Sequence, residues 1–327
     1  MLFGDSPPPG LVGIAKLAAA SEVLEAKRSV EYFEIGCRSV LNRTRPGMPF
    51  EWSLNPYRGC EFGCRYCYAR YTHEFMELRD SADFEDKIYA KSNLGPILKR
   101  ELKRVDCKGG IAIGTATDPY QPLEGRYRIT RGVLEELARA RTSAHLITRS
   151  PLVVRDIDVL GALSRAAGVS VCISLPTLDE ALARKIEPTV APPRQRLRAV
   201  RMLAAAGIRV GVAVAPILPH LTDGETSLRN VFAAAADAGA SMAWHNLLNL
   251  NEVARESYFG FLRAEFPSLV AGHETYYRRK YAPKALTEGI DARVRRARSG
   301  IRLRAKRTIA VAHRVVQLSL LEGGVSL

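Results

Sequence analysis

The stretch GCEFGCRYCYAR, residues 59–70, contains three cysteines with the spacing Cys-x3-Cys-x2-Cys. They are Cys60, Cys64 and Cys67, and an aromatic residue, Tyr66, precedes the last of them. Three thiolates this close in sequence can bind three irons of a cubane [4Fe–4S] cluster, because such clusters take cysteine ligands. The fourth iron would lack a protein ligand and would be open to a small molecule. The spacing therefore predicts an enzyme with an iron–sulfur cluster that has one open iron.

Two other interpretations of the three cysteines stay open. A structural zinc site needs four protein ligands in a tetrahedral shell, and His73, six residues after Cys67, could supply the fourth. A disulfide between two of the three cysteines would leave the third thiol unpaired. Zinc ribbons usually combine two distant Cys-x-x-Cys pairs, and this spacing is unlike them. We therefore favour the cluster.

The composition limits the class of protein. The chain has 327 residues, of which 47% are hydrophobic, enough for one large α/β domain or two small ones. No apolar run approaches the ~20 residues that span a membrane, and the first residues lack the pattern of a signal peptide. Six cysteines, three of them in one window, fit a reducing compartment. We expect a cytoplasmic protein with no membrane association.

The formal net charge of +14 predicts attraction to polyanions, with nucleic acid as the first candidate. Residues 293–307 contribute eight basic side chains in fifteen positions. The alternative is a solvated basic tail that binds nothing. Further on, QLSLL at 317–321 resembles the short peptide by which bacterial proteins dock on the DNA polymerase sliding clamp, although an ordinary apolar segment is an alternative.

Apolar runs that suit buried strands alternate with helical patterns through most of the chain. The expected strands are 50–54, 110–114, 144–148, 169–175, 208–215 and 241–247, and the expected helices are 68–78, 131–141, 154–167, 194–206, 225–238 and 254–265. Such alternation predicts six parallel β/α units, arranged as a barrel or as a doubly wound open sheet. In either arrangement ligands bind at the carboxyl ends of the strands, and the cysteines follow the first strand. Residues 11–28 are Ala-rich and predict a helix.

Cys60-x3-Cys64-x-Tyr66-Cys67 resembles the signature of the radical S-adenosylmethionine (SAM) superfamily. The runs NPYRGC (55–60) and TATDPYQP (115–122) resemble the branch related to spore photoproduct lyase, often labelled DNA repair photolyase. The resemblance implies a partial (β/α)6 TIM-type barrel over about 36–270, with an N-terminal lead-in (1–35) and a basic C-terminal extension (271–327). It also implies that the open iron binds SAM. An electron donor of the flavodoxin or ferredoxin type would drive cleavage of SAM to methionine and a 5′-deoxyadenosyl radical.

Polar side chains at the ends of the later strands are candidates for SAM contacts. Hydroxyl and carboxylate oxygens can accept hydrogen bonds from the methionyl ammonium, and an arginine fork can bind the methionyl carboxylate. Resemblance to the branch assigns Tyr66 a place near the adenine and Ser174 a contact with SAM. The predicted SAM-binding residues are Tyr66, Thr115, Thr117, Asp118, Arg149 and Ser174. An Asx turn at Asp118 and a surface position for Arg149 are the alternatives.

A further run that resembles the branch, Glu187-Pro188-Thr189, is followed by Arg194 and Arg196, and Pro216 also matches. Arg194 could act near the cofactor or simply begin a helix.

One departure from the branch affects the reaction. Spore photoproduct lyase uses a cysteine as hydrogen-atom donor, and the matching position here is Gly114. No cysteine lies between 108 and 171, and Cys172 is one strand further on. This departure argues against the lesion-repair reaction of that enzyme but not against radical generation. A lyase or DNA-repair type of reaction stays open, and the catalytic residues stay unassigned.

The sequence thus predicts a radical SAM enzyme that acts on nucleic acid. One alternative is a radical SAM enzyme for a peptide or a small metabolite, whose positive charge is incidental. Another is a non-enzymatic DNA-associated protein with a structural metal site.

Overall fold

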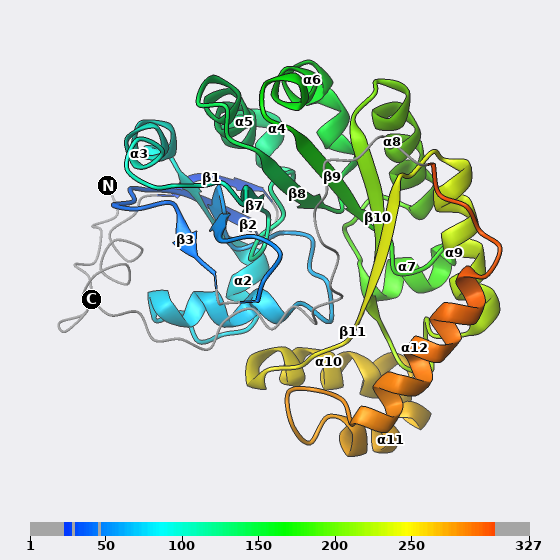
Figure 1. Cartoon of the computed structure of the whole chain (residues 1–327). Helices are drawn as coiled ribbons and strands as arrows, with labels where there is room; N and C mark the ends of the chain where they lie inside the picture. Colours follow the sequence, from blue (N-terminus) through cyan, green and yellow to red (C-terminus); the bar gives the residue numbers. More distant parts are fainter. Residues whose placement is uncertain (1–22, 28–29, 45–46, 305–327) are drawn as a thin grey trace.

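A curved, mostly parallel sheet forms the centre of the protein (Figure 1). The computed structural model describes residues 23–27, 30–44 and 47–304. The strand order is β11-β10-β9-β8-β7-β4-β3, in which the first six strands named are parallel and β3 is antiparallel to β4. The bounds are β3 Asn42–Arg43, β4 Trp52–Leu54, β7 Ile111–Ile113, β8 Ala144–Thr148, β9 Val169–Ser174, β10 Arg209–Ile217 and β11 Met242–Leu247. All six predicted strands are confirmed.

Helices follow the strands and cover the outer face of the sheet. The helices of this layer are α3 Leu94–Glu101, α5 Ile129–Arg139, α6 Ile157–Ala166, α8 Pro193–Ala205 and α9 Glu225–Asp237. The other helical segments are η1 Tyr68–Met76, α2 Asp83–Asp86, α4 Glu124–Tyr127, η2 Pro151–Asp156, α7 Glu180–Ile186, α10 Glu252–Glu265, η3 Pro267–Leu269 and α11 Val270–Tyr276, of which α10 packs against η1 and α2 against β6. Among the described residues the edge strands β11 and β3 do not pair with each other. The fold is therefore an open, partial TIM-type barrel, as the resemblance implied.

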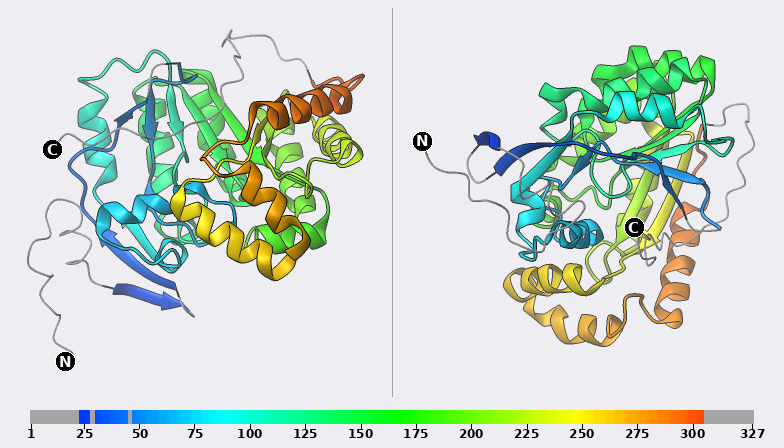
Figure 2. Two further views of the ribbon diagram at one scale, coloured as in Figure 1. Left: turned by 90° about the horizontal axis from the view of Figure 1, so that it is seen from below. Right: turned by 90° about the vertical axis from the view of Figure 1, so that its left-hand side faces the viewer.

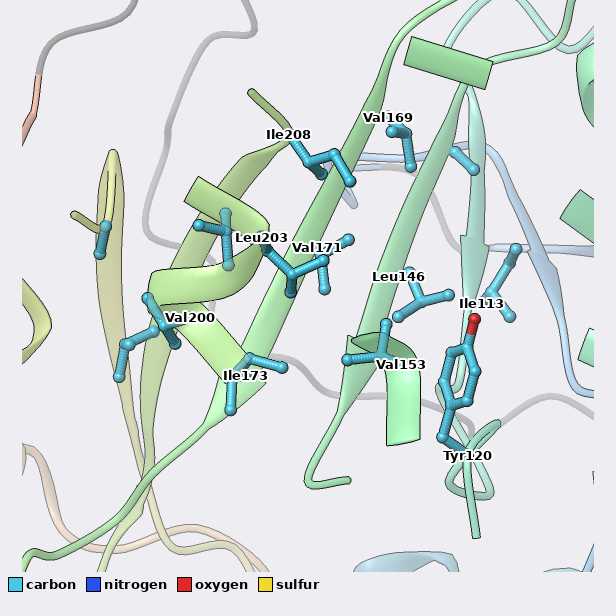
Figure 3. Packing of buried hydrophobic residues seen from close by; sticks show 14 of the residues in the cluster. Ile113, Tyr120, Leu146, Val153, Val169, Val171, Ile173, Val200, Leu203 and Ile208 are labelled. Carbon is cyan, nitrogen blue, oxygen red and sulfur yellow. The ribbon is translucent and has the colours of Figure 1, made fainter. Parts of the chain in front are cut away.

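The core lies between the sheet and these helices. Val171 and Ile173 of β9 are fully buried and lie opposite Val200 and Leu203 of α8 (Figure 3). Each such side chain contributes about 1.5–3 kcal/mol when it is removed from water. The intervening positions Cys172 and Ser174 face the other way because side chains alternate along a strand. Alternation therefore leaves the inner face of the barrel to smaller and polar residues.

A second, four-stranded sheet of order β1-β2-β6-β5 was not predicted. β1 (Val23–Lys27) is antiparallel to β2 (Val30–Ile35), β6 (Lys87–Lys91) is parallel to β2, and β5 (Tyr57–Arg58) is antiparallel to β6. The expected helix over 11–28 is thus wrong for residues 23–27, because pairing with β2 overrides the local helical preference. Residues 11–22 lie outside the described part.

The last described helix, α12 (Lys284–Arg298), packs along α9. Figure 2 shows α10, α11 and α12 grouped at one end of the molecule, away from α5 and α6. The predicted lead-in therefore contributes strands to the second sheet, and the predicted extension contributes a helix; the domain boundaries stay predictions. The clamp-like segment 317–321 lies outside the described residues. Within those residues, the helices are too short or too polar to cross a membrane.

Candidate functional site

The three cysteines of the signature line one cavity. Cys60, Cys64 and Cys67 form one wall, and the opposite walls come from the carboxyl ends of β7, β8, β9, β10 and β11. Parallel strands end at the same edge of a sheet, so residues far apart in sequence meet here. The cavity also contains Tyr66, Thr115, Thr117, Asp118, Arg149 and Ser174, which are all of the predicted SAM-binding residues.

Two glycines allow the cysteine loop to take its path. Gly59 has a φ of +77°, and a Cβ there would lie 2.7 Å from the carbonyl oxygen of Lys87. Gly63 has a φ of +57°, and a Cβ there would lie 2.2 Å from Glu85 Oε2. Only glycine combines this backbone conformation with so little space. The loop therefore needs its glycines as well as its cysteines.

The environment of the thiols suits a polynuclear centre. Burial raises the pKa of Cys64 to about 12 and raises that of Cys60 well above its usual range, so the binding of iron must displace protons. Among the described residues, no three Cys, His, Asp or Glu side chains are close enough to share one metal ion. The three thiols lie on one wall of the cavity. Cysteine thiolates are the ligands of cubane clusters, so this wall fits three corners of such a cluster.

His73 does not take part in this arrangement. Its side chain is buried, its Nε2 lies 3.0 Å from the carbonyl oxygen of Lys87, and its ring packs edge-on against Phe84 and Tyr89. Burial lowers the pKa of His73 to about 4, so the ring is neutral at pH 7. His73 is absent from the residues that line the cysteine cavity, and the structure therefore does not assemble a Cys3His zinc site.

The two threonines after β7 position neighbouring loops. Thr117 Oγ1 donates to the carbonyl oxygen of Gly59 at 2.5 Å, and the amide of Gln121 donates to the same oxygen at 3.2 Å. Thr115 Oγ1 accepts from Asn55 Nδ2 at 3.2 Å, and its carbonyl oxygen accepts from Tyr68. Both threonines thus line the cavity and hold the cysteine loop against the end of β7.

Asp118 links β7 to β8. Its Oδ1 accepts from Thr148 Oγ1 at 2.6 Å and from the backbone N–H of Tyr120 at 2.9 Å, which makes the Asx turn that was the alternative interpretation. Its Oδ2 accepts from the backbone N–H of Arg149 at 2.6 Å. Asp118 therefore fixes the backbone from which Arg149 enters the cavity.

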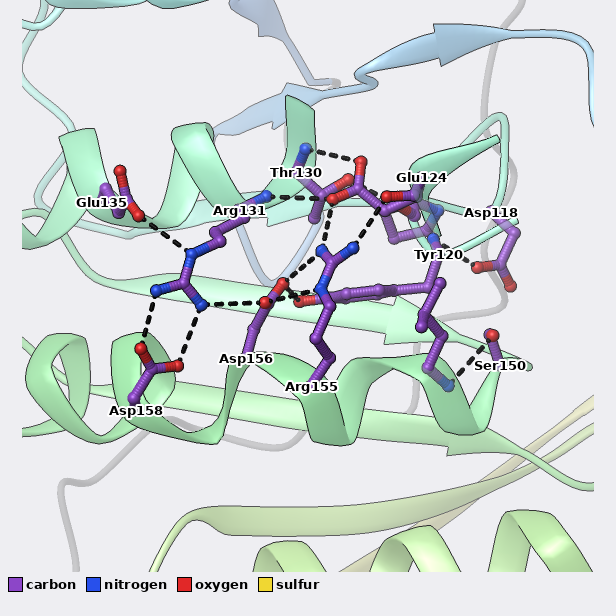
Figure 4. A network of polar contacts seen from close by, with 12 residues as sticks. Asp118, Tyr120, Glu124, Thr130, Arg131, Glu135, Ser150, Arg155, Asp156 and Asp158 are labelled. Atoms are coloured by element: carbon purple, nitrogen blue, oxygen red, sulfur yellow. Dashed lines mark hydrogen bonds and ion pairs between the residues drawn. The ribbon is translucent and has the colours of Figure 1, made fainter. Parts of the chain in front are cut away.

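A buried network of charges supports this loop from behind (Figure 4). Tyr120 donates to Asp156 at 2.9 Å, and Arg155 bridges Asp156 at 2.8 Å and Glu124 at 2.7 Å. Burial alone would raise the pKa of Asp156, but hydrogen bonds from Arg155, Arg131 and Tyr120 hold it below its usual range. Asp156 therefore stays ionised, and it and Glu124 are both paired with Arg155, so the loop after β7 rests on a rigid base.

Arg149 belongs to a buried four-residue network that sequence reasoning did not foresee. Glu187 accepts hydrogen bonds from Tyr66 and, at 3.3 Å, from Arg149 Nε, and its other oxygen lies 2.6 Å from Arg196. The Arg149 guanidinium lies over the Tyr66 ring at 5.7 Å. Glu187 and Arg196 are each about 1% exposed. Arg149 and Arg196 share the single carboxylate of Glu187, so the network carries one excess positive charge. Arg149, which lines the cavity, brings positive charge to its wall.

Ser174, Arg194 and Pro216 have distinct positions. Ser174 lines the cavity, its Oγ donates to the carbonyl oxygen of Ala215 at 2.9 Å, and its carbonyl oxygen accepts from Arg196 at 3.0 Å. Pro216 also lines the cavity. The Arg194 side chain is 74% exposed and faces Glu180 at 3.7 Å, so Arg194 begins a helix and does not reach the cofactor site.

Sequence reasoning did not single out Trp244, Asn246 and Asn249, which line the cavity from β11 and the segment after it. The one feature of the sequence that could have identified these residues is their position at the end of a predicted strand.

Gly114, which stands where the branch has its cysteine, lies in the cavity wall, and a Cβ there would be 2.4 Å from the carbonyl oxygen of Ile147. Cys172 is buried outside the lining residues and accepts from Trp244 Nε1 at 3.0 Å.

The basic segment is partly neutralised within the fold. Arg293 pairs with Asp223, and Arg296 lies 2.8 Å from Glu225. These pairs join α12 to the beginning of α9. Two of the eight basic side chains in 293–307 are thus paired within the fold, and residues 305–307 lie outside the described part.

Comparisons with known proteins agree with this site. Residues 54–229 match the family model of the Radical SAM superfamily. An uncharacterized protein of Mycobacterium tuberculosis is 33% identical over 300 residues, which cover 90% of this chain and 87% of that protein. An uncharacterized protein of Methanocaldococcus jannaschii is 28% identical over 197 residues, which cover 60% of this chain and 71% of that protein.

Among solved structures, a variant of spore photoproduct lyase matches with a TM-score of 0.64 and 15% identity, over 90% of this chain and 84% of that chain. A variant with bound AdoMet and dinucleoside spore photoproduct matches with a TM-score of 0.63 and 15% identity, over 83% and 79% of the two chains. At this identity the likeness shows the fold, and it confirms the partial TIM-type architecture. Because the family model spans more than half of the chain and contains its cysteine triad, the chain belongs to the radical SAM superfamily of enzymes.

Proposed function

We propose that this enzyme cleaves SAM reductively with a [4Fe–4S] cluster bound by Cys60, Cys64 and Cys67, and that it acts on nucleic acid. The observation that carries the proposal is that the three cysteines and Arg149 line the same cavity at the carboxyl ends of the strands. When bound, the cluster supplies one electron that breaks the sulfonium–C5′ bond of SAM, which yields methionine and a 5′-deoxyadenosyl radical.

The side chains of the cavity would bind and orient SAM. Arg149 offers the cation for the methionyl carboxylate, and Glu187 fixes the direction of its guanidinium. Thr115 and Ser174 place hydroxyl groups along the wall, and Tyr66 places a ring beside Arg149. Such a fixed arrangement lowers the cost of ordering the ligand before reaction.

Support for a nucleic-acid substrate comes from the net charge of +14. Pairing with Asp223 and Glu225 neutralises two of the α12 arginines within the fold. The six cysteines are all free, which fits the cytoplasm as the proposed location.

Deuterium transfer tests the proposal as a whole. Anaerobically reconstituted enzyme with dithionite and SAM is expected to form 5′-deoxyadenosine, and the product should gain deuterium from a deuterated nucleic-acid substrate. Label taken only from peptides or metabolites would support the other radical SAM interpretation. One equivalent of zinc with no iron, and no 5′-deoxyadenosine, would support a non-enzymatic metal-site protein.

The proposed electron donor, of the flavodoxin or ferredoxin type, has a candidate docking groove behind the cysteine loop. Arg65 stands between Cys64 and Cys67, and it lines a surface groove together with Arg184 and Lys185 of α7. Lys185 is paired with Glu265 at 2.8 Å, whereas Arg184 is exposed. Because Arg65 belongs to the cysteine loop, an acidic donor seated here would contact the loop that carries the three cysteines.

Replacing Arg184 by glutamate is therefore expected to raise the KM for a flavodoxin about tenfold, since charge reversal at a rim mainly weakens association. The rate of 5′-deoxyadenosine formation with dithionite should stay within about twofold of the parent rate, because dithionite needs no docking. Arg198→Glu, an exposed position on α8, is the matched control. Equal effects of Arg184→Glu with both reductants would contradict docking in this groove.

A further inference from the structure

We infer that Arg58 and Lys91 form a binding site for a phosphate group beside the cysteine cavity. The assignment of its ligand as a backbone phosphodiester of the substrate rests on the proposed function, in which the substrate is a nucleic acid. The site itself is argued from burial, charge and position, and can be tested without SAM chemistry.

The second sheet places these two cations on one face. Arg58 of β5 lies opposite Tyr89 of β6, and Lys91 is two residues further along β6. Directly opposite residues of an antiparallel pair share a face, and so do residues two apart on one strand. Lys91 is 8% exposed, and its Nζ has one hydrogen-bond acceptor, the carbonyl oxygen of Asn55 at 2.7 Å. Arg58 is half-buried, and its enclosed Nε has no hydrogen-bond partner among the residues that the structure describes.

The charges of Arg58 and Lys91 are not balanced by the residues that the structure describes. Neither side chain forms an ion pair with a described residue. Glu101 is the carboxylate that acts on the Lys91 charge, and it already accepts hydrogen bonds from the backbone N–H groups of Val40 at 3.1 Å and Leu41 at 2.9 Å. Burial, and then the nearby Arg58 charge, lower the pKa of Lys91 to about 8. Buried cations without a counter-charge are costly, so a site of this kind is completed by an anion.

The beginning of α3 adds to the positive potential. α3 starts at Leu94, three residues after Lys91, and its preceding residue Asn93 bonds Cys37 through both ends of its amide, at 2.8 Å and 3.0 Å. The first N–H groups of a helix carry partial positive charge and favour phosphate. An arginine fork, an ammonium and a helix terminus are the donors that phosphate groups take in proteins.

Asn55 connects this site to the cavity. Its carbonyl oxygen accepts from Lys91, while its side-chain Oδ1 accepts from the backbone N–H of Ala116 at 2.8 Å and its Nδ2 donates to Thr115 at 3.2 Å. Thr115 and Ala116 both line the cavity. A nucleotide whose base enters the cavity would therefore have its backbone within reach of Arg58 and Lys91. The ligand chemistry is that of a phosphodiester beside a base held for reaction.

Calorimetric titration of the full-length, anaerobically purified protein with inorganic phosphate at constant ionic strength tests the site. Arg58→Gln and Lys91→Gln are each expected to weaken phosphate binding about tenfold or more, because each removes a charge-assisted hydrogen bond. Lys99→Gln is the matched control: it removes one charge from the far, exposed end of the same helix, and should change binding less than about twofold. Phosphate affinities that are equal in all four proteins, or no binding by the parent protein, would overturn the site.

Two further measurements separate the possible outcomes. Without phosphate, Arg58→Gln should melt no lower than the parent, since it removes an unpaired charge; a lower melting temperature would mean that Arg58 is structural. A labelled single-stranded oligonucleotide should lose affinity in parallel with phosphate, and the slope of log K against log salt should fall by about 1. If the variants lose affinity for phosphate but keep their affinity for the oligonucleotide, the nucleic-acid assignment is overturned in favour of a free phosphate ligand. SAM cleavage is scored separately, so either proposal can fail without the other.

Discussion

Replacing Cys64 by serine is expected to abolish both the iron–sulfur absorbance of the reconstituted enzyme and the formation of 5′-deoxyadenosine. Cys64 lies in the cavity wall between the other two signature cysteines in sequence. A serine hydroxyl is a hard oxygen ligand, whereas clusters of this type take soft thiolates. The measurements are iron content, visible absorbance and 5′-deoxyadenosine formed with dithionite and SAM.

Cys172→Ser is the matched control for this experiment. Cys172 is also a buried thiol, but it lies outside the cavity lining and accepts a hydrogen bond from the Trp244 indole. This variant should keep its iron and its SAM cleavage, because a serine can accept the same bond. Full iron content and activity in Cys64→Ser would show that the triad is not the cluster site and would remove the basis of the proposed function.

Replacing Glu187 by glutamine is expected to destabilise the fold by about 3–5 kcal/mol, because it leaves the buried Arg196 and the half-buried Arg149 without their counter-charge. The measurement is urea unfolding at pH 7. SAM affinity should also fall about tenfold or more, since Arg149 loses the contact that orients it. Glu180→Gln is the control: Glu180 faces the exposed Arg194 at 3.7 Å, and its loss should change stability by less than about 0.5 kcal/mol.

The same network predicts a dependence on pH. Burial would raise the pKa of Glu187, but the charges of Arg196 and Arg149 outweigh it and hold the pKa below its usual value of 4.5. The carboxylate therefore contributes its stability at every pH above that value, and loses it as the pH falls through the lowered pKa. The unfolding free energies of the parent and of Glu187→Gln should differ at pH 7 and converge in acid. A constant difference between pH 7 and the acid limit would contradict an ionised Glu187.

The amino-acid sequence was sufficient for the features that depend on short spacing or on periodicity. The cysteines fall within eight residues of one another, and the six central strands are apolar runs between helices with regular repeats. Local signals of this kind need no knowledge of distant contacts. They also predicted residues that line one cavity together, because parallel strands bring their carboxyl ends to one edge.

Only the tertiary structure decided which polar groups meet. Glu187 reaches Tyr66, 121 positions away, and Arg196, not Arg194, turns inward to it because the two arginines lie on different faces of α8. The second sheet pairs β2 with β6, more than fifty residues apart, and places Arg58 and Lys91 where no described carboxylate pairs with them. Such pairings arise when distant segments are buried together, and no local pattern in the chain records them.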